Sequence, residues 1–481
     1  MRFGGGRSKI IAGIVLVGAT SFAIMGGPAA AATFTVTNAN ASGVGSLTQA
    51  IADAEAGAGA DTITFDPSTN GLTIPTGANI NNHSVTITGN GVGVTILSGQ
   101  INVNAGSGGS AAATVSGMTV SSINVNSGSN STTTTTASFT DVIVGTGGVN
   151  VNSGFGSTTT ASFTDVVVEG GGVNINSGFD ASSTTASFVT SSVMGGLSAN
   201  ASASTTGVTI DGSTIQGGAG QDVLGANDSG TTVVVRASTI TNGDRGIDVS
   251  GSTVNVTNST VSDLVDSGIV VRSGTVTLQN VTVADTADSL DVAGESAVTV
   301  GNSLFVGSVG DACPGAQPTS LGGNLVDDAT CGFTATADQQ NVSLLLGALA
   351  DNGGPTMTRL PGAGSPAIDG GVATGCPIAD QRGVARPQDG NGDATIVCDS
   401  GAVEVAALPA VTTTTVPAVT TTVPAVTTTT PAAAVPVTTA VPIPAVLPPT
   451  GAGTSISTLA IISLALGAGL MVIAMRRRPT A

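Results

Sequence analysis

Short runs of alternating apolar and polar residues fill the central part of this 481-residue chain. Such alternation puts successive side chains on opposite faces of a β-strand. The repeated runs begin at Ile123, Val149, Val173, Val254, Val276 and Val298, and the last three recur every 22 residues. Because repeats of this length are typical of solenoids, the pattern predicts an all-β fold, a right-handed parallel β-helix with coils of about 22–26 residues over residues 84–310.

Turn residues support the same coil length. Asn258, Asn280 and Asn302 each stand between the end of one run and the start of the next. Asparagine tolerates the left-handed backbone conformation of a sharp corner, and stacked amides can hydrogen-bond along a solenoid. We therefore expect these residues to form a structural ladder, and a role as ligands is the alternative.

A short capping helix is expected before the first coil, within residues 33–83. Ser46 is a favourable N-cap residue, and the apolar residues after it share one helical face: Leu47, Ala50, Ile51 and Ala54. Such a helix would cover the open end of the solenoid core. The segment 33–66 resembles the N-terminal part of bacterial surface β-helix proteins, where GSLRxAI precedes a strand ending in ITFD, and Thr48 replaces the usual arginine.

Residues 1–32 have the features of a secretory signal peptide. The basic residues at its start are Arg2, Arg7 and Lys9. They precede the apolar run Ile10–Met25 and an A-x-A cleavage site at Ala30–Ala32. The pattern predicts export and removal of the peptide, and the alternative is an N-terminal membrane anchor.

A second membrane signal occupies residues 447–481. The apolar run Thr454–Met475 is long enough to cross a bilayer as a helix, and the basic cluster Arg476–Arg478 is expected to remain in the cytoplasm. The C-terminal helix is therefore expected to hold the exported chain in the membrane.

The pentapeptide before this helix is Leu447-Pro448-Pro449-Thr450-Gly451. It resembles the LPxTG sorting signal of Gram-positive cell-wall proteins, which a sortase cleaves between threonine and glycine. The resemblance implies that the sortase recognises Leu447, Pro448, Thr450 and Gly451 and transfers Thr450 to peptidoglycan. It also implies a secreted protein anchored in the cell wall, on the extracellular face of a Gram-positive bacterium.

Residues 408–446 repeat clusters of threonine between Val-Pro-Ala-Val units. Proline blocks regular hydrogen bonding, so we expect a disordered and extended stalk that reaches up to about 120 Å. Its threonines are either O-glycosylated or unmodified, and the sequence leaves both open.

Charge and aromatic content restrict the partners. Between residues 33 and 450 the chain has six arginines, no lysine and all 30 Asp and Glu residues, which gives a net charge of −24. Such a surface repels nucleic acid and anionic polymers, so no nucleic-acid partner is expected. The chain also has no Trp and no Tyr, so the aromatic platforms of many carbohydrate-binding clefts are missing.

Ordered motifs follow the solenoid within residues 311–407. They are Leu346–Thr356, Gly364–Asp369, Asp380–Gly383, Arg386–Gly390 and Cys398–Ala402. In this order they resemble the choice-of-anchor Q domain, a family whose members use differing C-terminal anchors. The resemblance implies a surface protein and implies no reaction.

All four cysteines of the chain lie in this region. They are Cys313, Cys331, Cys376 and Cys398, and an exported chain meets an oxidising environment. Three disulfide pairings are possible, and we favour the sequential one, Cys313 with Cys331 and Cys376 with Cys398, because it closes the shortest loops. Zinc ligation is the weaker alternative, since no CxxC pair or nearby histidine is present.

A possible calcium loop lies between the second pair of cysteines. Asp389, Asn391 and Asp393 offer oxygen ligands at alternate positions, with glycines between them. A full calcium loop would require glutamate at the twelfth position, where Ser400 stands. Calcium is thus a possible cofactor, and an acidic turn is the competing interpretation.

Catalytic chemistry has few candidates, and we assign no catalytic residue. The acidic candidates are Asp244, Asp248, Asp263 and Asp266, with Arg272 one coil on. The one histidine, His83, stands beside a turn where the solenoid begins and is interpreted as a polar turn residue.

Two functions remain. The first is a wall-anchored, non-enzymatic surface protein for adhesion or structural display toward an unknown surface or glycan. The second is a wall-bound polysaccharide lyase or glycoside hydrolase of the β-helix type, which would require carboxylates that converge on one strip of the solenoid.

Overall fold

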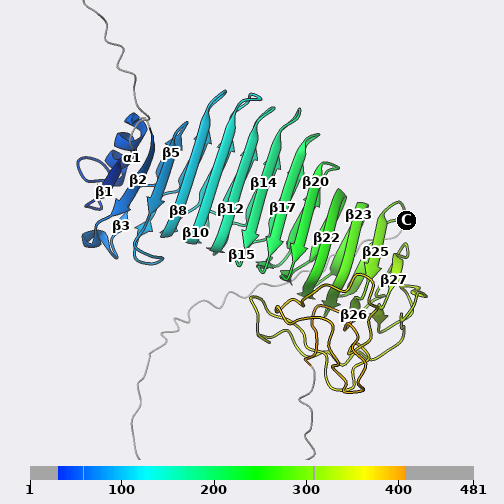
Figure 1. Ribbon diagram of the computed structural model, residues 1–481. Helices are drawn as coiled ribbons and strands as arrows, with labels where there is room; N and C mark the ends of the chain where they lie inside the picture. Colours follow the sequence, from blue (N-terminus) through cyan, green and yellow to red (C-terminus); the bar gives the residue numbers. More distant parts are fainter. Residues whose placement is uncertain (1–30, 58, 307–308, 407–481) are drawn as a thin grey trace, which may run out of the picture. The chain divides into compact units, whose positions relative to one another are not determined.

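The computed structural model describes residues 31–57, 59–306 and 309–406 (Figure 1). These residues are mostly β and form a right-handed β-solenoid of about 11 turns, as the sequence predicts. Within the described ranges, no helix has the length and apolar character needed to span a bilayer. The expected signal peptide, stalk, sorting signal and C-terminal transmembrane helix lie outside the described residues, and so remain predictions.

Each coil places its strands on three faces, and every strand pairs in parallel with its equivalent one coil away. The first face contains β1 (Thr33–Val36), β2 (Ala60–Phe65), β5 (Ser84–Thr88), β8 (Ser110–Val120), β10 (Thr134–Val144), β12 (Thr158–Val168), β14 (Ser183–Val189), β17 (Thr205–Asp211), β20 (Thr231–Arg236), the middle parts of β22 (Ile247–Leu264) and β23 (Ser267–Ala284), β25 (Ala297–Gly301) and β27 (Thr319–Gly322).

The second face follows a corner after the first. It contains β3 (Thr73–Ile74), β6 (Ile96–Leu97), the ends of β8, β10, β12, β22 and β23, and the strands β15 (Ser192–Met194), β18 (Thr214–Gln216), β21 (Thr239–Gly243), β26 (Leu304–Val306) and β28 (Leu325–Val326). The third face contains β4 (Ala78–Asn81), β7 (Ile101–Ala105), β9 (Ile123–Ser127), β11 (Val149–Ser153), β13 (Val173–Ser177), β16 (Leu197–Ala201), β19 (Leu224–Asn227), the starts of β22 and β23, and β24 (Asp288–Val292).

Equivalent residues of successive coils stack in the core. Phe139 pairs in register with Phe163, and Phe163 with Phe188, and all three rings are fully buried. Their centroids are 5.2 and 4.7 Å apart, and neighbouring rings are stacked nearly parallel. The recurrence of Ala-Ser-Phe in the sequence is therefore the signature of an internal aromatic stack, surrounded by buried valine and isoleucine.

The predicted capping helix is confirmed as α1 (Leu47–Ala56). The side chain of Ser46 accepts a hydrogen bond from the backbone N–H of Gln49 at 3.2 Å, as an N-cap does. The residues predicted for its apolar face are the buried ones: Leu47, Ala50, Ile51 and Ala54. A short 3₁₀ helix, Pro67–Thr69, follows β2.

The expected ladder of turn asparagines is only half correct. Asn258, Asn280 and Asn302 have φ angles of 46°, 52° and 49°, so the left-handed corner is confirmed. Their Nδ2 groups do not bond to one another. They donate instead to the backbone carbonyls of Ala379, Asp399 and Val372, because the C-terminal segment packs along this corner.

An amide ladder does form on the outer side of the third face. In one row, Asn124 donates to Asn102 at 3.0 Å and Asn150 donates to Asn124 at 3.1 Å. In a parallel row, Asn152 donates to Asn126 at 2.9 Å. The repeated INVN and VNVN segments thus place valine and isoleucine in the core and asparagine on the surface.

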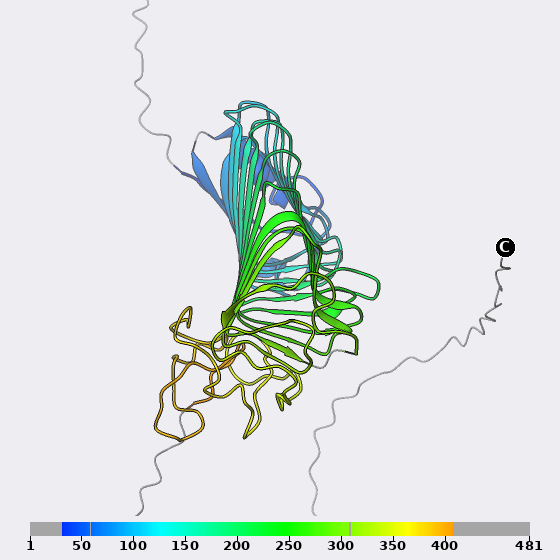
Figure 2. The same cartoon turned by 90° about the vertical axis from the view of Figure 1, so that its right-hand side faces the viewer.

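The C-terminal segment first continues the solenoid and then covers one side of it (Figures 1 and 2). β27 and β28 extend the ladders beyond residue 310, where the sequence suggested that the solenoid ends. Later residues form irregular loops with isolated bridges. Gln381 is buried at the junction, where its side chain accepts from the Thr260 hydroxyl and donates to the carbonyl of Ser238.

Candidate functional site

A polar groove of about 530 Å³ lies over the third face and the turns that lead into it. Its charged residues are Asp222, Arg245, Asp248 and Arg272, and its other lining residues are mainly glycine, asparagine, serine and glutamine. Two of the six arginines of the exported segment therefore lie in one groove.

Successive coils position the charged side chains. Asp222 lies in the turn before β19, and Arg245 occupies the equivalent turn one coil later, before β22. Asp248 is the second residue of β22, and Arg272 belongs to β23 on the next coil. The parallel register brings these residues from three successive coils to one strip.

The two arginines bind both carboxylates. Arg272 Nε lies 3.0 Å from Asp248 Oδ1, and Arg272 Nη2 lies 2.6 Å from Asp248 Oδ2. Arg245 Nη1 lies 3.3 Å from Asp248 Oδ2, and Arg245 Nε lies 2.7 Å from Asp222 Oδ1. Such paired contacts fix the orientation of the carboxylates.

The electrostatics of the groove follow from these ion pairs. The hydrogen bond to Asp248 raises the pKa of Arg272 above its usual value. The Asp248 side chain is 10% exposed and that of Arg272 is 49% exposed, so the guanidinium faces solvent over a largely covered carboxylate. Two positive and two negative charges therefore meet in the groove, and guanidinium groups contact both carboxylates.

The other acidic candidates do not join Asp248. Asp244 Oδ1 accepts a hydrogen bond from the backbone N–H of Gly220 at 3.1 Å. Asp263 forms an ion pair at 2.8 Å with Arg359 of the C-terminal segment, outside the groove. Asp266 stacks on the turn of Asp244, with its N–H 2.9 Å from the Asp244 carbonyl. The four candidates therefore do not converge on one strip.

An acidic column along this turn was missed by the sequence analysis. It comprises Asp244, Asp266 and Asp288, whose common spacing of 22 residues is the signal that reveals it. Burial raises the pKa of Asp288, and the nearby charges of Asp291, Asp266 and Asp311 raise it further. Within the described residues, no three of His, Cys, Asp or Glu are placed to hold a metal ion.

His83 lies in the turn between β4 and β5, as expected for a polar turn residue. Its Nε2 lies 3.4 Å from Oδ2 of the buried Asp61, near the capping helix and away from the groove.

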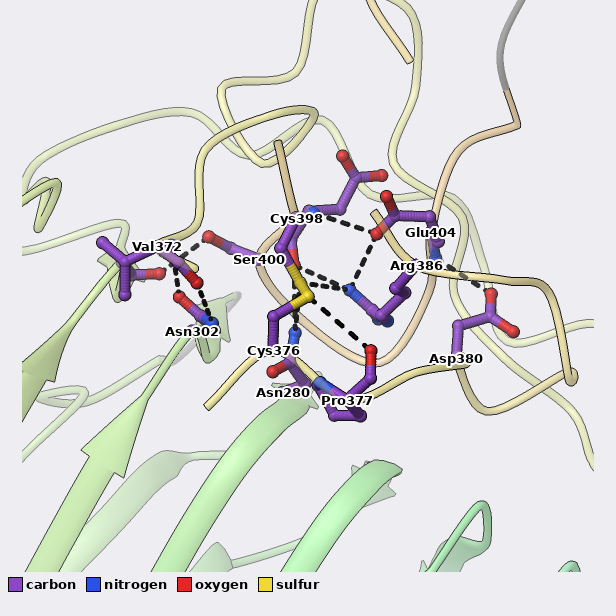
Figure 3. The surroundings of a disulfide bond; sticks show 12 residues. Asn280, Asn302, Val372, Cys376, Pro377, Asp380, Arg386, Cys398, Ser400 and Glu404 are labelled. Atoms are coloured by element: carbon purple, nitrogen blue, oxygen red, sulfur yellow. Dashed lines mark hydrogen bonds and ion pairs between the residues drawn. A yellow bond between two sulfur atoms is a disulfide. The ribbon is translucent and has the colours of Figure 1, made fainter. Parts of the chain in front are cut away.

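The predicted sequential disulfides are confirmed. Cys313 pairs with Cys331, and Cys376 pairs with Cys398, with Cα–Cα distances of 4.8 and 6.2 Å. Figure 3 shows the second bridge. The first bridge joins the last coils, and the second joins two loops of the C-terminal segment.

Three of the ordered motifs, Asp380–Gly383, Arg386–Gly390 and Cys398–Ala402, meet in one buried polar network around the second disulfide (Figure 3). Arg386 pairs with Glu404 and also donates to the carbonyls of Asp399 and Gly401, at 2.8 and 2.7 Å. Asp380 accepts from the backbone N–H of Glu404 at 2.9 Å. Burial raises the pKa of Asp399 to about 7. These motif residues hold the loops together, and Arg386 and Cys398 also line a pocket of about 460 Å³ with Pro387, Ile396 and Val397.

In the predicted calcium loop, the side-chain oxygens accept hydrogen bonds from backbone N–H groups of the same loop. Asp389 Oδ1 accepts from the N–H groups of Gly392 and Asp393 at 2.7 and 3.1 Å. Asp393 Oδ1 accepts from the N–H of Thr395, and hydrogen bonds to Thr395 lower the pKa of Asp393. Asn391 Oδ1 accepts from the N–H of Asp393. These contacts fit an acidic turn, and calcium binding stays a prediction.

Comparisons with known proteins agree with the fold. Residues 195–344 match a family model described as the right handed beta helix region. Two solved structures are similar: the crystal structure of pectate lyase Pel9A, with 14% identity over 79% of this chain and 97% of that chain and a TM-score of 0.40, and Geobacillus virus E2 ORF18, with 12% identity over 60% of each chain and a TM-score of 0.32. No curated protein matches the sequence. The fold of the described residues is a right-handed β-helix, and these similarities carry no conclusion about the activity of the chain.

Proposed function

We propose that this protein is a cell-wall-anchored surface protein that displays a β-helix without catalysing a reaction. The observation that carries the proposal is the order of signals at the C-terminus: a threonine- and proline-rich segment, Leu447–Gly451, an apolar run of membrane-spanning length and Arg476–Arg478. A signal peptide at the other end supplies the export that such a signal requires. Sortase and peptidoglycan are the partners.

Two further observations support display. The motifs that resemble the choice-of-anchor Q domain follow the solenoid directly and precede the sorting signal, which is the order expected of a presented domain. Both carboxylates of the groove are held in ion pairs with arginine, and the remaining acidic candidates lie apart. An exported segment with a charge of −24 is well solvated and resists non-specific adhesion to anionic polymers.

The anchor is tested with Thr450→Ala in the full chain, expressed with its own signals in a Gram-positive host. Loss of the Thr450 side chain that the sortase recognises is expected to leave the protein in the membrane fraction and absent from the material that a muramidase releases. Thr439→Ala, in the stalk, is the matched control and is expected to reach the wall normally. Covalent wall linkage of the Thr450→Ala variant would contradict the proposal.

The second candidate function is cleavage of a polysaccharide by lyase or glycoside hydrolase chemistry. The observation that favours it is the groove over the third face, where Arg245 and Arg272 offer positive charge beside two carboxylates. Hydrolysis with an acid and a base requires two carboxylates free for proton transfer or attack. Incubation of residues 33–450 with neutral polysaccharides, followed by a reducing-end assay, tests it, and measurable cleavage would replace display by catalysis.

A further inference from the structure

The outer surface of the third face changes along the solenoid. One row of outward positions, aligned by the parallel register, contains Asn79, Asn102, Asn124, Asn150, Asn174, Ser198, Gly225 and Asp248. Five coils carry an asparagine whose amide bonds to its neighbour. The side chain then shortens to that of Ser198 and disappears at Gly225, so the ladder is interrupted by a recess.

The backbone does not require glycine at position 225. A Cβ added there would lie 3.6 Å from Asn227 Nδ2 and 3.7 Å from Ser198 Oγ, which are ordinary van der Waals contacts. The φ angle of Gly225 is outside the left-handed region that favours glycine. Glycine in a strand interior normally lowers the stability of the strand, and neither close contacts nor the backbone conformation require it at position 225.

The recess opens into the charged part of the groove. Asp248 occupies the next position of the same row, and Arg272 and Asn227 lie beside it. Arg272 uses Nε and Nη2 for Asp248, and its side chain is half exposed toward the groove. The described lining residues include no aromatic side chain and offer many hydrogen-bond donors and acceptors.

We propose that this groove binds a neutral, polyhydroxylated ligand, a segment of a neutral glycan. Its planar amide, carboxylate and guanidinium groups present adjacent donors and acceptors, which suit neighbouring hydroxyl groups. A charged ligand would have to compete with the Arg272–Asp248 or Arg245–Asp222 ion pair, and the surrounding surface repels anionic polymers. Successive coils present polar groups to the groove at the strand spacing of about 4.8 Å, so the groove suits a polymer that lies along the solenoid axis.

This inference deepens the proposed function, because it names the ligand class of the displayed β-helix. Its test uses the secreted chain, residues 33–450, titrated with cellohexaose, mannohexaose and chitohexaose, and with a hexamer of galacturonate as the anionic probe. Isothermal titration calorimetry and NMR chemical-shift changes measure binding. Without aromatic stacking, we expect weak binding, with Kd on the order of 1 mM.

Gly225→Asn is the decisive variant, since it continues the ladder and fills the recess. Gly207→Asn is the matched control: Gly207 is an outward residue of β17 on the first face, and an added Cβ there has its nearest neighbour at 3.9 Å. Thermal unfolding confirms that both variants fold.

The expected result is that at least one neutral hexasaccharide binds the unmodified chain and the Gly207→Asn control equally. Gly225→Asn is expected to bind at least about tenfold more weakly. Absence of binding by all three neutral probes, equal binding by Gly225→Asn, or preference for the galacturonate hexamer would overturn the inference. Glycan binding by the secreted chain is measured independently of wall linkage. Failure of this inference is therefore distinguishable from failure of the Thr450→Ala test.

Discussion

Arg386 and Glu404 form a fully buried ion pair, with Arg386 Nη1 2.9 Å from Glu404 Oε2 and both side chains 0% exposed. The same Oε2 atom accepts from the N–H of Asp399, and Oε1 accepts from the N–H of Gln388. A buried charge is tolerated when its partner and hydrogen bonds are in place and is costly when they are not. The C-terminal loops, which have few strands, are thus held by polar contacts and a disulfide.

Substitution of one partner tests this role. Glu404→Gln should destabilise the C-terminal segment by about 3–5 kcal/mol, because it leaves the Arg386 guanidinium buried without a counter-charge. Hydrogen exchange of residues 380–404 is the measurement, since a solenoid does not unfold as one two-state unit. The exposed Arg236→Gln, at the end of β20, is the control and should have little effect. Unchanged protection in Glu404→Gln would show that the ion pair does not stabilise these loops.

The stability of these loops should also depend on pH. Asp399 has its pKa raised by burial from 3.8 to about 7. The folded state therefore binds the proton more tightly than the unfolded state, so stability is highest below about pH 4 and falls as pH rises to 7. The change attributable to Asp399 is at most about 4 kcal/mol.

Asp399→Asn should remove most of this pH dependence, because the amide does not ionise. The two carboxyl oxygens of Asp399 accept hydrogen bonds from the N–H groups of Asp369 and Val405. Asparagine keeps one of these two acceptors. Protection of the loops followed by hydrogen exchange, after correction for the intrinsic exchange rate at each pH, provides the measurement. A loop stability that rises from pH 4 to 7 would contradict the assignment.

The phenylalanine stack should be the most sensitive part of the core. Phe163→Ala removes the central ring of three and should cost about 3–5 kcal/mol locally, because a cavity remains between two coils. Phe155→Ala is the matched control, since Phe155 belongs to the same coil and is 54% exposed. Chemical denaturation of both variants gives the comparison, and equal losses would show that the stack contributes little.

Removal of the second disulfide should loosen the C-terminal segment and spare the coils. The double variant Cys376→Ser, Cys398→Ser opens a bridge that spans 22 residues and should cost about 3 kcal/mol. Limited proteolysis is expected to cleave between residues 376 and 398 first, while the solenoid stays resistant. The reverse order of cleavage would contradict the assignment of the bridge to these loops.

The sequence predicted the features that depend on local pattern. Ser46 and the apolar residues after it specify the capping helix, and the recurrence of Ala-Ser-Phe specifies coils in register. It could not predict contacts between distant segments. Asn258 donates to Ala379, 121 residues away, because loops with no regular pattern pack on the corner where it stands. Local spacing alone suggested a ladder there.

The groove was hidden for a related reason. The sequence marked Asp248 only as an acidic residue. Its role depends on Arg245, three residues earlier in the chain, and on Arg272 in the next coil. The interruption at Gly225 becomes visible when the strands are aligned in three dimensions, because the loop before β19 makes that coil longer than its neighbours. Because the coils differ in length, rows of equivalent residues are hard to see in the sequence. The parallel register of the strands makes them plain.

We propose that the chain is a displayed surface protein joined to the wall through one residue. The decisive measurement is mass spectrometry of the C-terminal peptide, from protein that a muramidase releases from the walls of a Gram-positive host. We expect a peptide that ends at Thr450 and carries peptidoglycan fragments on its carboxyl group. A mature protein that still contains residues 451–481, or that ends elsewhere without peptidoglycan, would contradict it.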